Sequence, residues 1–134
     1  IGYVGSEYAF AQKIPYARVQ NQRGEFVEPN ANSISAAASG EIPTDTRTSI
    51  TNADAAGAYP ISTFTWMIIY KEQNYSGRSK EQAIATLDLL KYILSDEAQN
   101  ITSEVHYAPL PAKAKELSMT NLKSVTFDGV AILQ

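Results

Sequence analysis

Cysteine is absent from the sequence, which excludes disulfides, thiolate metal sites and cysteine nucleophiles. The single histidine, His106, argues against a His-rich metal site or a His-based catalytic triad. Basic residues are also scarce: 11 Lys and Arg stand against 14 Asp and Glu, and the resulting net charge of -3 disfavours a nucleic-acid binder. No apolar run approaches the ~18–20 residues of a membrane-spanning helix.

The composition that remains is that of an ordinary globular domain, with 134 residues, 44% of them hydrophobic and 19% charged. The chain opens on Ile1–Val4, a β-type apolar run that starts without Met, a basic segment or a signal-peptide core. Such a start favours a piece of a longer chain. A true N-terminal strand of a processed protein is the alternative.

The first 58 residues predict short elements separated by turn residues. Gly5 and Ser6 break the first strand, Pro15 ends a first helix, and Gly40 ends a second, Ala-rich helix. The expected elements are a strand at Ile1–Val4, a helix at Glu7–Lys13, a hairpin from Tyr16–Val19 to Glu25–Val27, a helix beginning at 29–32, and a polar loop at Glu41–Gly57.

The strongest β signal in the chain lies at Tyr59–Tyr70, where β-branched and aromatic residues dominate. The segment first alternates between polar and apolar residues and then becomes wholly apolar. This pattern predicts a strand that is half exposed at its beginning and buried on both faces at its end. Pro60 must lie at the start of the strand or on a sheet edge.

The last third of the chain is predicted to be helical. Ser79 and Gln82 form a capping-box pattern before a helix at 80–94, whose apolar stripe of Ile84, Leu87, Leu90 and Leu94 is widened by Leu89 and Ile93. Helices at Glu97–Val105 and Ala112–Met119 follow, and Asp128-Gly129 predicts a type I′ hairpin. The whole order is an α/β pattern, with a composition shift at 57–59 that indicates a boundary between two lobes.

Residues that could carry chemistry are few. His106, beside Glu104 and Tyr107, is interpreted as a surface or loop-packing residue, since no second histidine accompanies it. The acidic residues are dispersed and form no metal-binding motif, and no glycine-rich phosphate loop is present. Hydroxyls can hold an oxyanion without a cation, so weak candidate ligand-binding residues are Ser62, Thr63 and Thr65, although ordinary strand threonines are the simpler interpretation.

Three segments, at residues 1–9, 58–65 and 107–111, together resemble the phosphate-binding proteins of ABC transporters. Ile1-Gly2-Tyr3-Val4 with the following Glu7-Tyr8-Ala9 is similar to one family motif, and Ala58–Thr65 is similar to the strand that contains Tyr-Pro-Ile. Tyr107-Ala108-Pro109-Leu110-Pro111 is similar to a late loop of the family. The three occur in the family's order and cover nearly all of the chain.

The resemblance implies a C-terminal portion of a periplasmic-binding-protein-like fold of the second type. Residues 1–58 would then belong to the second lobe, with 1–4 as a hinge strand. Residues 59–134 would supply the return hinge strand and the C-terminal part of the first lobe. The implied hinge residues are Tyr3, Val4, Tyr59, Pro60 and Ile61.

The implied function is the capture of inorganic phosphate, outside the cytoplasm, for the permease of an ABC transporter. The protein would be periplasmic or lipid-anchored. It would not be an enzyme, and it would need no cofactor or metal. The family's ligand loop has no counterpart here. None of the four arginines is flanked by the residues that surround the binding arginine in the family's ligand loop. No ligand residue can therefore be assigned from that loop. A receptor for sulfate or molybdate and an interaction or sensing module of the same fold remain alternatives. The excised segment is expected to associate with other copies through unpaired strand edges.

Overall fold

The computed structural model describes residues 1–133 and contains five helices and two small hairpins within that range. Its helix and strand content agrees with the predicted α/β class. The elements, in chain order, are α1 (Ser6–Ala11), β1 (Val19–Gln20), β2 (Phe26–Val27), α2 (Ala31–Ala37), α3 (Lys80–Ile93), α4 (Asp96–Glu104), α5 (Ala112–Lys123), β3 (Thr126–Phe127) and β4 (Val130–Ala131).

The hairpin β1–β2 is held to the loop before residue 59 by a buried asparagine. The Asn21 amide nitrogen donates to the Glu25 carboxylate (2.8 Å) and to the Ala58 carbonyl (3.2 Å). Its oxygen accepts from the backbone amides of Arg23 and Glu25, both at 3.0 Å. Glu25 also accepts from the Gly57 amide at 2.8 Å. The bonds to Arg23 and Glu25 close the turn, and the bonds to Gly57 and Ala58 hold the loop against the hairpin. Every polar atom of the buried Asn21 side chain thus has a partner.

Side-chain caps begin three of the helices, and the capping box of α3 is the one predicted above. Ser79 accepts from the amide of Gln82, and Gln82 returns a bond to the Ser79 amide, which completes the capping box of α3. Ser95 caps α4 by accepting from the amide of Ala98. A further capping box, between Asn30 and Ser33, begins α2. At α5, Pro111 is the N-cap residue, and the helix runs past the predicted end at Met119 to Lys123.

The predicted hairpin at Asp128-Gly129 is confirmed, with φ angles of 53° and 74° at the two turn residues, as a type I′ turn requires. Glu72 binds this turn from outside. Its carboxylate accepts from the amides of Asp128 (3.0 Å) and Gly129 (3.1 Å) and from the Thr126 hydroxyl (2.8 Å). Together with the Asn74 amide, these donors lower the pKa of Glu72 to about 2.

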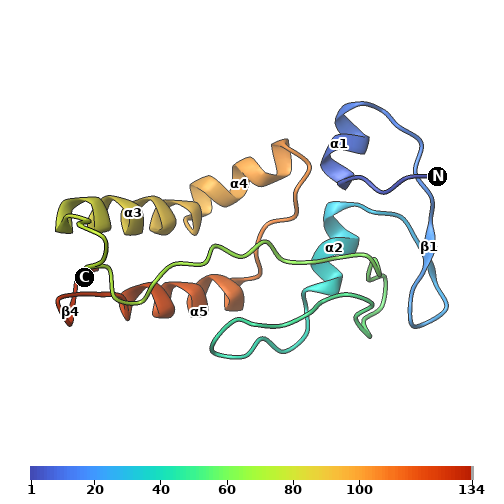
Figure 1. Ribbon diagram of the computed structural model, residues 1–134. Coiled ribbons are helices and arrows are strands. Elements are labelled where there is room, and N and C mark those ends of the chain that lie inside the picture. Colours follow the sequence, from blue (N-terminus) through green and yellow to red (C-terminus); the bar gives the residue numbers. More distant parts are fainter. Residues whose placement is uncertain (134) are drawn as a thin grey trace.

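Two small hydrophobic cores lie at opposite ends of an extended segment, residues 59–72. One core surrounds Ala37, Ala38, Ile50 and Ala58, and the other joins α3 to α5 through Leu87, Leu122 and Val125. Figure 1 shows the extended segment running past α2 and then between α3 and α5. Phe64 packs on the first core and Ile69 on the second, so this segment connects the two ends of the molecule.

Two predicted strands are wrong as regular elements. Ile1–Val4 and Tyr59–Tyr70 have no strand assignment, although both were predicted from β-type residues. A strand needs a ladder of hydrogen bonds with a neighbour, and within the described residues the second segment makes only two isolated backbone bonds, at Tyr59 and Pro60. Burial at the end of the second segment is also wrong, because Ile68 is 94% exposed.

On α3, Leu87 is fully buried as expected, whereas Leu89 is 58% exposed and does not widen the buried stripe. Two residues along a helix turn the side chain by about 200°, so both leucines cannot face one core of this size. None of the helices within residues 1–133 is both long and apolar enough to cross a membrane.

Candidate functional site

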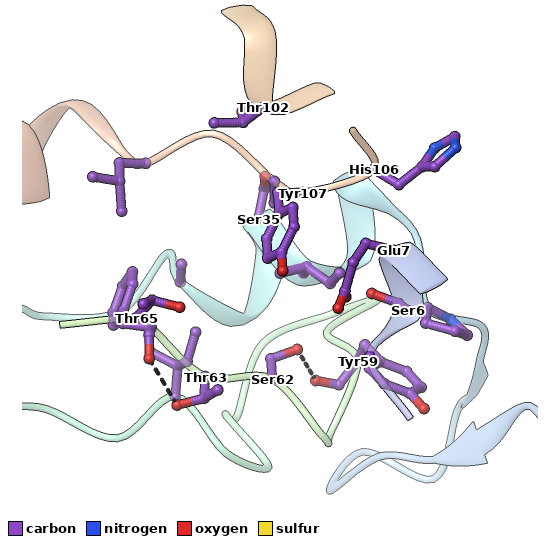
Figure 2. A pocket seen from close by; sticks show the side chains of 18 of the residues that line it. Ser6, Glu7, Ser35, Tyr59, Ser62, Thr63, Thr65, Thr102, His106 and Tyr107 are labelled. Carbon is purple, nitrogen blue, oxygen red and sulfur yellow. Dashed lines mark hydrogen bonds between the residues drawn. The ribbon is translucent and has the colours of Figure 1, made fainter. Parts of the chain in front are cut away.

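A central cleft of about 1060 Å³ opens along the extended segment. Its walls come from the N-terminal residues and α1, from Ile34 and Ser35 of α2, from the extended segment, from the C-terminal end of α3, and from one face each of α4 and α5. The loop that joins α4 to α5 closes one end. Polar residues that line it include Ser6, Glu7, Ser35, Tyr59, Ser62, Thr63, Thr65, Thr102, His106 and Tyr107 (Figure 2).

The three predicted hydroxyl ligands all line this cleft. The Ser62 side chain is buried and donates to the Tyr59 carbonyl at 2.8 Å. The Thr63 hydroxyl donates to the carbonyl of Phe64 at 3.2 Å (Figure 2). A hydroxyl has one proton, so Ser62 and Thr63 in this arrangement offer lone pairs to the cleft and not the donor that an oxyanion needs.

Charge inside the cleft is acidic. Glu7 is its only charged residue among those described as lining it, and neither Lys nor Arg takes part. The arginines are engaged elsewhere. Arg23 pairs with Asp54 and Arg47 with Asp45, both at 2.8 Å, whereas Arg18 lies 3.9 Å from Glu28. Arg78 binds the Gln82 carbonyl and the Thr86 hydroxyl beside α3. An anion in this cleft would therefore meet no Lys or Arg side chain from the described residues.

Tyr107 and Glu7 face each other within the cleft (Figure 2). The negative charge of Glu7 raises the pKa of the Tyr107 hydroxyl, and partial burial adds to the effect. This pair was missed in the sequence, because the two residues are a hundred positions apart and each stands in a different motif. The pairing connects α1 to the segment after α4.

His106 lies at the cleft rim in a left-handed backbone conformation, with φ at 64°. Its ring packs edge-on against Phe10, with the centroids 5.6 Å apart. Neighbouring Tyr107 is oriented by Glu7 and not toward the imidazole. The contact with Phe10 agrees with the predicted packing role of His106.

Four of the five predicted hinge residues, namely Tyr3, Val4, Tyr59 and Ile61, line the same cleft, and the fifth, Pro60, is buried beside it. The Tyr59 amide donates to the Ser33 carbonyl at 3.0 Å, and the Pro60 carbonyl accepts from the Asn52 amide at 2.7 Å. These bonds fix the start of the extended segment to α2 and its following loop. No group of three or more acidic or histidine residues able to hold a metal occurs in residues 1–133.

Comparison with known proteins identifies relatives along most of the chain, although no protein-family model matches it. A phosphate-binding protein PstS of Xylella fastidiosa is 37% identical over 114 residues, which is 83% of this chain and 30% of the relative. One from Methanocaldococcus jannaschii is 28% identical over 134 residues, which is 93% of this chain and 34% of the relative. A protein of Acanthamoeba polyphaga mimivirus, named as a candidate serine/threonine-protein kinase/receptor, is 27% identical over 128 residues and matches through 7% of its own length.

The chain thus spans about a third of the length of the curated phosphate-binding relatives that it matches. That share is consistent with the C-terminal portion indicated by the order of the three motifs. The resemblance is confirmed: the chain is homologous, over most of its length, to a portion of the phosphate-binding proteins.

Proposed function

We propose that this chain is part of an extracytoplasmic solute-binding protein that captures inorganic phosphate and delivers it to the permease of an ABC transporter. The observation that carries the proposal is the 37% identity to a phosphate-binding protein over 83% of the chain. Two lobes would close around the ion, with residues 1–58 in one lobe and residues 59–134 in the other. The role proposed is binding, in keeping with the names of the phosphate-binding relatives.

In this proposal the described residues form walls and hinges, and the ion is bound mainly by groups outside them. The absence of Lys and Arg from the described lining, together with the Glu7 carboxylate, supports this division. The hinge would be formed by Tyr3 and Val4 on one crossing and by Tyr59, Pro60 and Ile61 on the other. Ser62, Thr63 and Thr65 remain candidate ligands only if their hydroxyls rotate toward the ion when the lobes close.

A sensing module is a second candidate function. The mimivirus relative favours it, because a segment like this one occurs there within a protein named as a kinase/receptor. In such a protein the lobes would report a bound solute to a partner instead of delivering it to a permease. Capture of another oxyanion, such as sulfate or molybdate, is the remaining alternative.

The test is calorimetric titration of the product of the complete reading frame that contains this chain. We expect one phosphate to bind per protein, with sulfate and molybdate failing to compete at equal concentration. Preference for sulfate or molybdate would replace phosphate as the solute. A folded product that binds none of the three would contradict the capture of phosphate or a related oxyanion.

A further inference from the structure

The loop that follows α2 leaves its own core and reaches the helical end of the molecule. Ile50, later in this loop, packs in the core beside α2, so the loop is anchored at that end. Residues 43–47, the strap, extend from there to the α5 side of the molecule (Figure 1). Thr46 of the strap also lines the central cleft. The strap thus starts within residues 1–58 and lies against residues 59–134.

Two side chains from residues 59–134 donate hydrogen bonds to backbone carbonyls of the strap. The indole nitrogen of Trp66 donates to the Thr46 carbonyl at 3.3 Å. Nδ2 of Asn121, on α5, donates to the Thr44 carbonyl at 3.1 Å. Leu122, the next residue of α5, belongs to the core between α3 and α5. The strap therefore connects the two hydrophobic cores by a second route, beside the extended segment.

The tip of the strap is held in one conformation by its own hydrogen bonds. The Thr46 amide donates to the Pro43 carbonyl at 2.8 Å. The backbone amide and the guanidinium of Arg47 both donate to the Asp45 carboxylate, at 3.1 and 2.9 Å. Thr46 has a left-handed backbone, with φ at 60°, which is unusual for a β-branched residue. Such backbone outliers persist where the surrounding structure enforces them, and they cluster at clamps and switch regions.

The bonds to the strap lie far along the chain from the proposed hinge at Tyr59–Ile61. An extended chain rises about 3.3 Å per residue, so Trp66 lies up to about 20 Å beyond Pro60. At that distance a rotation of about 10° about the hinge moves a group by up to about 3.5 Å, which breaks a hydrogen bond. Opening of the lobes would therefore separate the strap from Trp66 and Asn121, while bonds at the hinge itself would change little.

We propose that the strap, Trp66 and Asn121 form a latch between the two lobes, which holds them together and must open before a bound solute is released. This inference rests on the proposed function, since it takes residues 1–58 and 59–134 as parts of the two lobes. Every group of the latch belongs to this chain. The latch would set the rate of solute release and not the choice of solute, because its two carbonyls bind the opposite lobe.

The test measures solute release from the product of the complete reading frame that contains this chain. Radiolabelled phosphate is bound and then chased with an excess of unlabelled phosphate. Trp66→Phe and Asn121→Leu each remove one donor of the latch. Each is expected to speed release by about 2- to 10-fold, which is the effect of losing one hydrogen bond. A side chain that only stabilises the fold would leave the release rate unaltered.

Two matched controls separate the latch from general effects of substitution. Tyr92→Phe removes a hydroxyl from a ring that is 45% exposed, close to the 44% of Trp66. Asn100→Leu repeats the change made at Asn121 at another exposed asparagine of a helix. Neither control residue is among the described residues that line the cleft, and both variants should release phosphate at the unaltered rate. Release from the latch variants at the rate of the controls, in a folded receptor, would overturn the proposal.

A second measurement uses no phosphate, so that the latch and the proposed function can fail separately. The complete product is labelled with 15N-tryptophan, and the indole N–H signal of Trp66 is identified by its loss in Trp66→Phe. Thr46→Pro should disrupt the strap, because proline cannot take a positive φ and lacks the N–H that binds the Pro43 carbonyl. Exchange of the Trp66 indole proton with water should then quicken, and X-ray scattering should give a larger radius of gyration.

The outcomes of this second measurement are distinct. Unchanged indole exchange in a folded Thr46→Pro variant would overturn the latch. Faster exchange with an unchanged radius of gyration would show a local tether that does not hold the lobes, and would overturn it too. If both quantities change as expected but the unaltered receptor binds no phosphate, the proposed function is refuted and the latch is supported.

Discussion

Replacing Leu87 with alanine tests the packing of α3 against α5. Leu87 is fully buried, and it joins Leu122 and Val125 in the core that holds the helical end of the molecule. A buried Leu→Ala change generally costs about 2–5 kcal/mol, with the cost set by how far the site can collapse around the lost atoms. Partly exposed neighbours such as Leu90 and Leu94 can move into the space. We therefore expect about 2–3 kcal/mol, the lower part of that range.

The matched control is Leu89→Ala, since Leu89 lies on the same helix but is 58% exposed. Alanine favours helix slightly more than leucine, so this change should stay within about 0.5 kcal/mol of the unaltered chain. Urea unfolding followed by circular dichroism at 222 nm measures both. With a slope of about 1–3 kcal/mol/M, Leu87→Ala should lower the midpoint by about 1 M. Equal shifts for the two variants would refute the packing of α3 described above.

Three further variants test separate features. His106→Ala should leave the solute affinity of the complete receptor nearly unchanged, because the imidazole ring packs on Phe10. A loss of affinity of about two orders of magnitude at unchanged stability would instead indicate acid–base or ligand chemistry. Glu72→Gln should destabilise the chain at pH 7. The folded-state pKa of Glu72 is depressed to about 2, so its contribution to folding stability is complete above the ordinary pKa of 4.5 and is lost as pH falls from 4.5 toward 2. Over that range the urea midpoint should fall more steeply for the unaltered chain than for the variant. Identical pH profiles would contradict the hydrogen bonds from the β3–β4 turn to Glu72. Asn21→Ala should lower the free energy of unfolding, measured in urea, by about 1–3 kcal/mol, because it leaves buried backbone groups without partners. The control, Asn100→Ala, alters an exposed residue and should have little effect. Similar losses for the two variants would argue against the Asn21 network.

The local elements could be predicted from the sequence because short-range chemistry specifies them. Ser79 with Gln82 fixes the start of α3, and Asp128-Gly129 fixes the last hairpin. Each signal involves residues within a few positions, so neither depends on the rest of the fold. The same is true of the Gly24-containing turn between β1 and β2, where the glycine takes a φ angle of 80°.

Long-range features could not be predicted in this way. Whether Ile1–Val4 and Tyr59–Tyr70 form strands depends on neighbours that pair with them, and β-propensity does not supply a partner. The Glu7–Tyr107 pair and the binding of Glu72 to the β3–β4 turn join residues that no local pattern relates. The apolar run at the end of the extended segment did predict burial on two faces.

The central claim is that phosphate is bound only when this chain is completed by the rest of a receptor. Calorimetric titration of phosphate into the chain alone and into a chimaeric receptor, in which this chain replaces the matched portion of the Xylella fastidiosa relative, tests it most directly when both are measured under the same conditions. We expect saturable binding by the chimaera and none by the chain alone, whose cleft offers a carboxylate and no Lys or Arg side chain among the described lining residues. Sub-micromolar binding by the chain alone, or a folded chimaera that binds no phosphate, would contradict the claim.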